Sequence, residues 1–220
     1  AIRGVEMGVD VISPASHKCF DTMDDLLNLI EDIATRTGLP VGIKSAVGKT
    51  HLWHALADQM VLRKSGPDFI TIDGGEGGTG AAPPSFADHM SLPFFNGFSI
   101  VYKIFQERNL TNKIVFVASG KLGLPANAAR ALAMGADVIN VAREAMMSIG
   151  CVQAQLCHTN KCPSGVATQN KWLQAGIDPT LKSERLFNYV QYFKKELIAL
   201  VHASGYEHPC QYKMSDIETT

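Results

Sequence analysis

Three cysteines stand close together in the last third of the sequence. The segment CVQAQLCHTNKCPSGVATQ contains Cys151, Cys157 and Cys162, and Pro163 directly follows the last of them. The chain has only 5 cysteines, and crowding three into one segment is not typical of a secreted disulfide framework. Reduced thiols bind metals, so the segment predicts a metal centre, with buried cysteines that bind nothing as the alternative.

Two kinds of metal centre suit these thiols. Structural zinc takes four ligands, so a zinc site would need His158 or a distant residue, and His158 lies too close to Cys157 in sequence for easy joint chelation. Three thiolates with a proline after the last are typical of iron–sulfur ligation, and three local thiols suit a three-iron cluster. The pattern favours iron–sulfur over zinc. Cys19 and Cys210 receive no role.

A glycine-rich stretch, GGEGGTGAAPPS, begins at Gly74 and has five glycines in the seven residues 74–80. Glycines let backbone N–H groups approach a ligand without interference from a Cβ atom. The stretch matches neither the Walker phosphate loop nor a G-x-G-x-x-G opening a helix. It predicts a ligand-binding loop, with a tight turn that binds nothing as the alternative.

Several cations lie in or just after apolar runs. Lys44 lies inside the run VGIKSAV, where an ammonium is costly unless it is paired or faces a polar cavity. We interpret it as functional, with a carboxylate partner or a side chain that reaches the strand end as the alternative. Gly120-Lys121 and Ala142-Arg143 end two later runs, and cations with backbone N–H groups at such places suit a phosphate. Ordinary solvated loop charges are the alternative for these two.

Short β-branched runs alternate with helical patterns and must position these residues. The runs 41–47, 68–73, 113–119 and 137–142 predict buried parallel strands, and helices are predicted at 51–64, 98–108 and 125–134. Four β/α units suit a doubly wound sheet or part of an eight-unit barrel, and both place functional loops at the carboxyl ends of the strands. The predicted fold class is therefore α/β.

Helix punctuation supports these elements. Thr22 and Asp25 form a capping-box pattern for a helix over 24–37, and Gly38 stands where that helix should stop. Pro125 suits a first helical turn, and Gly135 ends the same helix before the next strand. A last amphipathic helix is predicted over 183–204, after the cysteine segment 151–169. Without a repeat or a convincing linker, residues 1–220 are predicted to form one domain.

Composition limits the partners. The chain of 220 residues is 46% hydrophobic and carries 20 Lys and Arg against 21 Asp and Glu, so it lacks the basic field of a nucleic-acid or anionic-membrane binder. It shows neither a long apolar run nor the order of a signal peptide, which predicts a cytoplasmic protein. The chain opens without Met, and we expect it to be a piece of something longer.

The segments ISPASHKCF, VGIKSAVG, DFITIDGGEGGTGAAPPSFADH, ASGKLGLPANAARALAMGAD and CVQAQLCHTNKCPSGVATQ, in this order and spacing, resemble the flavin domain of glutamate synthase. They resemble the stand-alone FMN-binding glutamate synthase family proteins of bacteria more closely than the large-subunit domain. The resemblance covers nearly the whole chain, and the cysteine segment joined to GVATQ is its most specific part.

The resemblance implies the C-terminal portion, about four of eight strands, of an FMN-dependent (β/α)8 TIM barrel with a 3Fe-4S cluster. It implies that Cys151, Cys157 and Cys162 bind the cluster. It also implies that Lys44 lies near the flavin ring, and Lys44 and Glu76 are candidates for substrate contacts, as carboxylate anchor and proton donor. The other residues implied at the FMN are Gly77, Gly78, Thr79, Gly80, Gly120, Lys121, Ala142 and Arg143.

The implied activity is that of an oxidoreductase acting on CH-NH2 donors, which reduces 2-iminoglutarate, formed from 2-oxoglutarate and ammonia, to glutamate. Electrons would come from ferredoxin or a pyridine-nucleotide-linked subunit, and ammonia from solution or another subunit, because the chain shows no glutaminase domain. The alternatives are a flavin and iron–sulfur redox protein with another substrate, and a non-catalytic, metal-stabilised fragment. Half a barrel leaves strand edges unpaired, so we expect the fragment to associate with itself.

Overall fold

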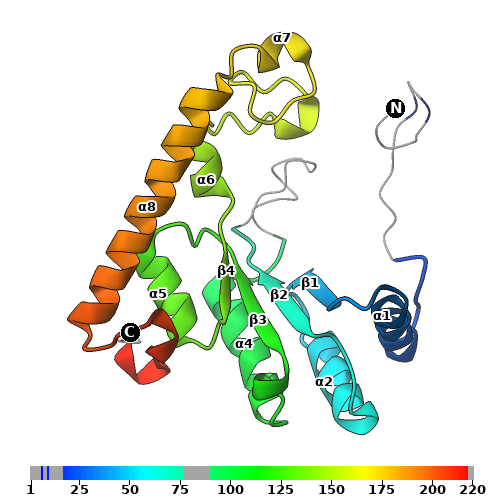
Figure 1. Ribbon diagram of the computed structural model, residues 1–220. Coiled ribbons are helices and arrows are strands. Elements are labelled where there is room, and N and C mark those ends of the chain that lie inside the picture. Colours follow the sequence, from blue (N-terminus) through cyan, green and yellow to red (C-terminus); the bar gives the residue numbers. More distant parts are fainter. Residues whose placement is uncertain (1–5, 7–8, 10–16, 77–89, 218–220) are drawn as a thin grey trace.

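Four parallel strands form one sheet in the order β1-β2-β3-β4 (Figure 1). The computed structural model describes Glu6, Val9 and residues 17–76 and 90–217. The strands are β1 (Gly42–Ala46), β2 (Phe69–Asp73), β3 (Val115–Ser119) and β4 (Val138–Asn140). Each lies inside a range that the β-branched runs predict, so the parallel α/β fold class is confirmed.

Helices alternate with the strands as predicted. α1 (Met23–Thr37) precedes β1, and α2 (His51–Arg63), α4 (Phe94–Gln106) and α5 (Pro125–Ala133) follow β1, β2 and β3. After β4 come the short helices α6 (Arg143–Ser148) and α7 (Lys171–Gln174), which the sequence pattern did not predict, and the long α8 (Pro179–Ala203). Single 3-10 turns are η1 (Thr111–Lys113), η2 (Cys157–Thr159), η3 (Pro209–Gln211) and η4 (Met214–Asp216).

The predicted punctuation of α1 and α5 is confirmed. The Thr22 hydroxyl accepts from the Asp25 N–H at 3.1 Å, while the Asp25 carboxylate accepts from the Thr22 N–H at 3.1 Å, and together they form a capping box. Gly38 closes α1 with φ 66°, a left-handed conformation that glycine adopts without strain. Pro125 occupies the first turn of α5.

Two helices begin earlier than their apolar patterns predict. α8 starts at Pro179 rather than at 183, because the Asp178 carboxylate accepts from the N–H groups of Thr180 and Leu181 at 2.9 and 3.3 Å. The first turn of α8 has a single large apolar side chain, Leu181, so periodicity alone could not show it. α4 starts at Phe94 rather than at 98, and its cap comes from Glu76, described below.

The two faces of the sheet have different surroundings. Ile70, Ile72, Phe116 and Ala118 are fully buried on the face that packs against the helices. Phe116 lies in an aromatic cluster with side chains of α4, including Phe98 with ring centroids 6.1 Å apart. In Figure 1, α1, α2, α4 and α5 follow one another along the sheet, and α8 lies beyond α5.

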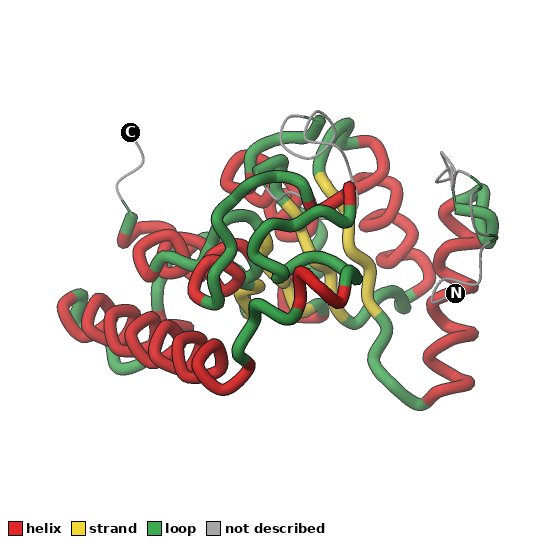
Figure 2. Tube along the Cα trace, turned by 90° about the horizontal axis from the view of Figure 1, so that it is seen from above, coloured by secondary structure: helices red, strands yellow, loops and turns green. Residues whose placement is uncertain are grey.

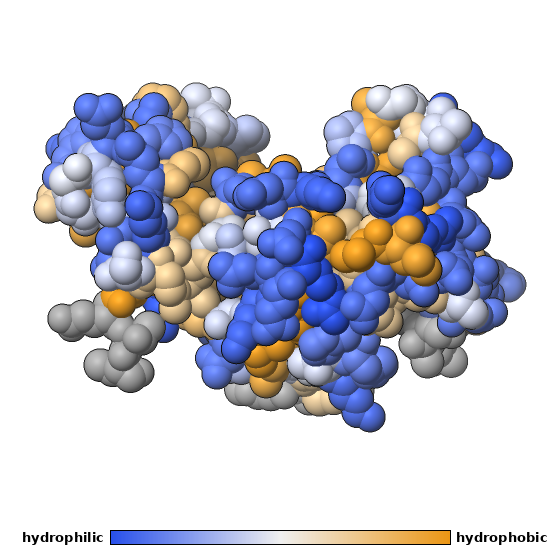
Figure 3. All heavy atoms as spheres, turned by 90° about the horizontal axis from the view of Figure 1, so that it is seen from below, coloured by the Kyte–Doolittle hydropathy of each residue, from blue (hydrophilic) through white to orange (hydrophobic). Residues whose placement is uncertain are grey.

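The opposite face of the sheet, called the open face below, is exposed around its margin, whereas Thr71 and Val117 at its centre are only 5% and 8% exposed. Lys44, Thr71, Val117 and Val138 stand in register across the four strands on this face. Val138 is 44% exposed and Val115, on the same face, is 43% exposed. Figure 2 shows the strands from above with their helices, and Figure 3 shows the molecule from below, hollowed between two lobes. Helices on one face only are compatible with part of a barrel wall.

Candidate functional site

The carboxyl edge of the sheet gathers polar residues in one row. Asp73, Ser119 and Asn140 are the last residues of β2, β3 and β4, and they pair in register. Because parallel strands end at the same edge, the loops that follow them also start there. The prediction that the polar and glycine-rich segments meet at one end of the sheet is confirmed for the described residues.

Lys44 lies on the open face and pairs with a carboxylate on the next strand. Its Nζ atom is 2.6 Å from Oδ2 of Asp73, and its side chain is 60% exposed. An exposed ion pair of this kind contributes about 0–1 kcal/mol to stability. The carboxylate partner that the sequence left as an alternative is therefore present, and the ammonium remains accessible from the open face.

Glu76 caps helix α4. Its carboxylate oxygens accept from the N–H of Phe94, the first residue of the helix, at 2.8 and 2.9 Å. Pro93, the residue before the helix, makes no side-chain hydrogen bond to it. The carboxylate of Glu76, distant in sequence, therefore accepts the hydrogen bond that an N-cap side chain would otherwise accept. A negative charge is favourable at a helix N-terminus. As a proton donor, Glu76 would have to act from this position.

Arg143 joins the ends of two strands that are not neighbours. It is the first residue of α6, and its Nη2 donates to the backbone carbonyl of Glu76 at 3.0 Å. Two of the predicted site residues are thus brought together. Ala142 is the N-cap residue of α6. Gly77, Gly78, Thr79 and Gly80 lie outside the described residues.

Gly120 and Lys121 both have positive φ, at 153° and 51°. A Cβ atom on Gly120 would lie 2.7 Å from Cβ of Phe94, so packing against α4 explains this glycine without a ligand. Lys121 is a non-glycine residue in the left-handed region, which costs on the order of 1–3 kcal/mol and is most common at functional sites. Its carbonyl accepts from the Asn127 side chain at 3.2 Å.

Helix α8 supports the loop that contains Gly120 and Lys121. The Tyr189 hydroxyl donates to the carbonyl of Gly123 at 2.7 Å, and burial, together with the nearby Glu144, raises the pKa of Tyr189. The sequence predicts only that Tyr189 lies in the amphipathic helix over 183–204. Its hydroxyl is the signal that could have indicated a polar partner, because a tyrosine that packs against other side chains usually hydrogen-bonds its O–H group.

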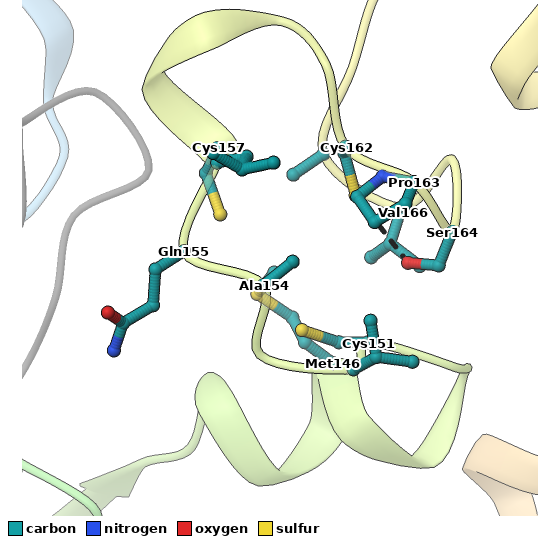
Figure 4. A pocket seen from close by; sticks show the side chains of 12 residues that line it. Met146, Cys151, Ala154, Gln155, Cys157, Cys162, Pro163, Ser164 and Val166 are labelled. Carbon is teal, nitrogen blue, oxygen red and sulfur yellow. Dashed lines mark hydrogen bonds between the residues drawn. The ribbon is translucent and has the colours of Figure 1, made fainter.

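The three predicted cysteine ligands line one pocket (Figure 4). Cys151 follows α6, Cys157 begins η2, and Cys162 lies on the loop after η2. His158, the extra ligand that a zinc site would need, does not line this pocket. The other lining residues are mostly apolar and are Met146, Val152, Ala154, Gln155, Leu156, Pro163, Ser164, Val166 and Ala167.

The thiol of Cys162 is buried and surrounded by hydrogen-bond donors. Burial raises its pKa, but hydrogen bonds from the Ser164 hydroxyl and from the N–H groups of Ala167, Ser164 and Val166 outweigh burial, so the pKa is lowered. Sγ of Cys162 is 3.5 Å from Oγ of Ser164 (Figure 4). Donors that favour the thiolate suit a metal ligand, because metals bind the thiolate form.

The chemistry of the donor set can be compared with that of an iron–sulfur cluster. Within residues 17–76 and 90–217, no three His, Cys, Asp or Glu side chains stand close enough to hold one metal ion. Three thiols nevertheless surround one apolar-walled pocket. A sulfur-bridged group of several irons accepts thiolates farther apart than one ion does, so the chemistry of these donors suits iron–sulfur ligation.

In the part of the chain that the structure describes, no helix combines the length and the apolar character needed to cross a membrane.

Comparison with known proteins gives a consistent result. Residues 1–207 match the family described as the conserved region in glutamate synthase. The chain is 39% identical over 216 residues to the glutamate synthase large subunit-like protein YerD of Bacillus subtilis (strain 168), covering 98% of this chain and 41% of that protein. It is 34% identical over 207 residues to the archaeal glutamate synthase (NADPH) of Methanocaldococcus jannaschii, covering 93% of this chain and 40% of that protein.

A more distant relative is the ferredoxin-dependent glutamate synthase of Pyropia yezoensis. It is 32% identical over 209 residues, which are 94% of this chain and 13% of that protein. The chain thus spans about two fifths of the length of the bacterial and archaeal relatives, 41% and 40%. It spans much less of the Pyropia protein.

Proposed function

Since the chain belongs to the glutamate synthase family, we propose that it forms the iron–sulfur site and one side of the flavin site of a glutamate synthase-like oxidoreductase. The observation that carries the proposal is the pocket in which Cys151, Cys157 and Cys162 meet. Only residues 141–150, including α6, separate the end of β4 from Cys151 along the chain. The proposed iron–sulfur site and the polar carboxyl edge of the sheet are therefore close to each other in sequence.

The four strands are proposed to be the C-terminal part of a (β/α)8 barrel. Helices pack on one face of the sheet, and the other face presents Lys44, Val115 and Val138 to solvent. In a barrel, the remaining strands would cover that face. The relatives are long enough to supply them, because this chain spans about two fifths of each of the first two.

FMN, when bound, would supply hydride transfer at the carboxyl edge. We propose that Lys121 and Arg143, with the backbone of Gly120 and Ala142, hold its phosphate. Charged N–H donors at neighbouring strand ends suit a phosphate group. Gly77, Gly78, Thr79 and Gly80 are proposed to lie against the flavin.

Lys44 is proposed to face both the flavin ring and the substrate. An ammonium has three N–H donors, and Asp73 accepts one of them. The others can anchor a substrate carboxylate such as that of 2-oxoglutarate. A cation here also stabilises negative charge that develops near the ring.

The proposed reaction is the reduction of 2-iminoglutarate, from 2-oxoglutarate and ammonia, to glutamate. A 3Fe-4S cluster on Cys151, Cys157 and Cys162 would supply one-electron transfer. The imine nitrogen needs a proton as its carbon is reduced, and Glu76 is the candidate donor of this chain. The electrons are proposed to come from ferredoxin or a pyridine-nucleotide-linked partner, which are the donors in the names of two relatives.

An anaerobic absorption spectrum of the purified chain, with iron and acid-labile sulfide measured on the same sample, tests this proposal. We expect flavin bands and about three irons per chain, the stoichiometry of a 3Fe-4S cluster. Glutamate should then form from 2-oxoglutarate, ammonium and a reductant. Flavin and iron without glutamate would favour a redox protein with another substrate, and a colourless, metal-free protein would contradict the proposal.

A further inference from the structure

A polar network around one buried threonine closes the loop that contains Cys162 and begins three residues after Cys157. Its centre is Thr168, which is 8% exposed. The Thr168 hydroxyl lies 2.6 Å from the backbone carbonyl of Asn160 and 2.8 Å from its side-chain Oδ1, and it donates to these acceptors. The nine residues 160–168, which would otherwise form an open loop, are thereby tied at their ends.

Three further hydrogen bonds complete the network. The N–H of Gln169 donates to Oδ1 of Asn160 at 2.6 Å, and the N–H of Asn170 donates to the Thr168 hydroxyl at 3.0 Å. The side chain of Gln174, on α7, donates to the Thr168 carbonyl at 2.6 Å. We call these five residues the Asn160–Thr168 clasp. Oδ1 of Asn160 and the hydroxyl of the buried Thr168 both make their hydrogen bonds inside the clasp.

The clasp borders Cys157 and Cys162. Asn160 ends the η2 turn that Cys157 begins, and its φ of 62° is a left-handed conformation that asparagine tolerates well. Cys162 follows two residues later. The N–H groups of Val166 and Ala167, which point to the Cys162 thiol, immediately precede Thr168.

Building on the proposed function, we propose that Asn160 and Thr168 are positioning residues that hold Cys157 and Cys162 in the arrangement that the cluster requires. Neither residue lines the pocket, so each acts through the thiols. A loop that is already ordered loses less conformational entropy when it binds a metal group, so more of the interaction free energy remains as affinity. Hydrogen-bonded partners behind metal ligands have this effect at many sites.

The test compares Thr168→Val, which keeps the shape and removes the hydroxyl, with Thr168→Ser, which restores it. Thr180→Val, on the exposed first turn of α8, is the matched control. Each purified chain is reconstituted anaerobically with ferrous iron and sulfide. Bound iron is measured against iron concentration, and the electron paramagnetic resonance signal of the oxidised cluster is recorded. We expect Thr168→Val to lose roughly 10- to 100-fold in iron affinity, and Thr168→Ser to recover most of it.

A second readout needs no metal. In the apo protein, the clasp should protect the buried Cys162, so Thr168→Val should speed its alkylation by iodoacetamide about tenfold, measured by mass spectrometry. Asn160→Gly is a second variant for the case that Thr168→Val folds poorly. It permits the same left-handed backbone and removes Oδ1, so it should raise the alkylation rate as Thr168→Val does.

Unchanged iron affinity and unchanged alkylation in both Thr168→Val and Asn160→Gly would overturn the inference. A lower melting temperature with an unchanged cluster signal would also overturn it, since the clasp would then only stabilise the fold. If the unmodified chain binds no iron, the iron–sulfur part of the proposed function fails, and the alkylation rates still decide on the clasp.

Discussion

Two regions of the molecule position their candidate site residues in different ways. At the carboxyl edge of the sheet the pairing register of the strands does so, whereas in the cysteine segment hydrogen bonds made by side chains do so. Asp73 and Ser119 are opposite each other because β2 and β3 pair along their backbones. Cys157 and Cys162 lie in irregular chain tied by Asn160 and Thr168. A point substitution can therefore disturb the cysteine segment more easily than the geometry of the edge.

The largest expected effect is in the cysteine segment. Cys162→Ser removes one of three thiols and should abolish most iron binding, because a hydroxyl is a poor ligand for iron–sulfur groups. Iron per chain is the measurement. Cys210→Ser, at an exposed cysteine outside the pocket, should keep the iron content of the unmodified chain. Full iron loading in Cys162→Ser would break the comparison, since the segment would then not be the metal site.

The open face of the sheet gives the next prediction. We propose that the 220-residue chain associates with itself through this face, where Val115 and Val138 are exposed. Val138→Lys places a charge on that face and should weaken the association about tenfold or more, as seen by size-exclusion chromatography with light scattering. Val61→Lys, at an exposed valine on α2, is the control. A monomer for the unmodified chain would contradict the proposal.

At the edge of the sheet, Arg143→Gln removes a cation without touching the cysteines. Losing one charged hydrogen bond should weaken FMN binding about 10- to 100-fold, with iron content unchanged. Quenching of flavin fluorescence measures the affinity. Arg36→Gln, in an exposed ion pair on α1, should bind FMN as the unmodified chain does. A parallel loss of iron in Arg143→Gln would show that the two regions are not independent.

The same difference explains what the sequence could predict. β-branched runs and a capping box carry local signals, so the strands and the start of α1 were predicted within a few residues. The pairs Lys44–Asp73 and Glu76–Phe94 join residues far apart in sequence, and their contacts depend on the tertiary fold, which periodicity does not give.

Some parts of the site had only weak signals in the sequence. The three cysteines were recognisable from their spacing, and all three line one pocket. The Asn160–Thr168 clasp was missed because polar loop residues are usually solvated, and only burial distinguishes Thr168 from them. Gly120 was interpreted as a ligand-binding residue, although its close approach to Phe94 is reason enough for a glycine.

The smallest expected effect on stability tests the two roles of Glu76. Glu76→Gln keeps the side-chain shape and removes the negative charge at the start of α4. Because that charge lies at a helix N-terminus, the free energy of unfolding should fall by only about 0.3–1 kcal/mol, measured by urea denaturation. Glu31→Gln, at a half-buried residue in the middle of α1, is the matched control.

Turnover of Glu76→Gln separates capping from catalysis. Loss of a general acid lowers the rate by about 10²- to 10⁴-fold, far more than so small a change in stability can explain. A fall of that size would support the proposed proton donor. Turnover within a few-fold of the unmodified chain would reject that role and leave Glu76 as the cap of α4. Glu76 would then serve the structure alone, and the proton would have to come from another group or from water.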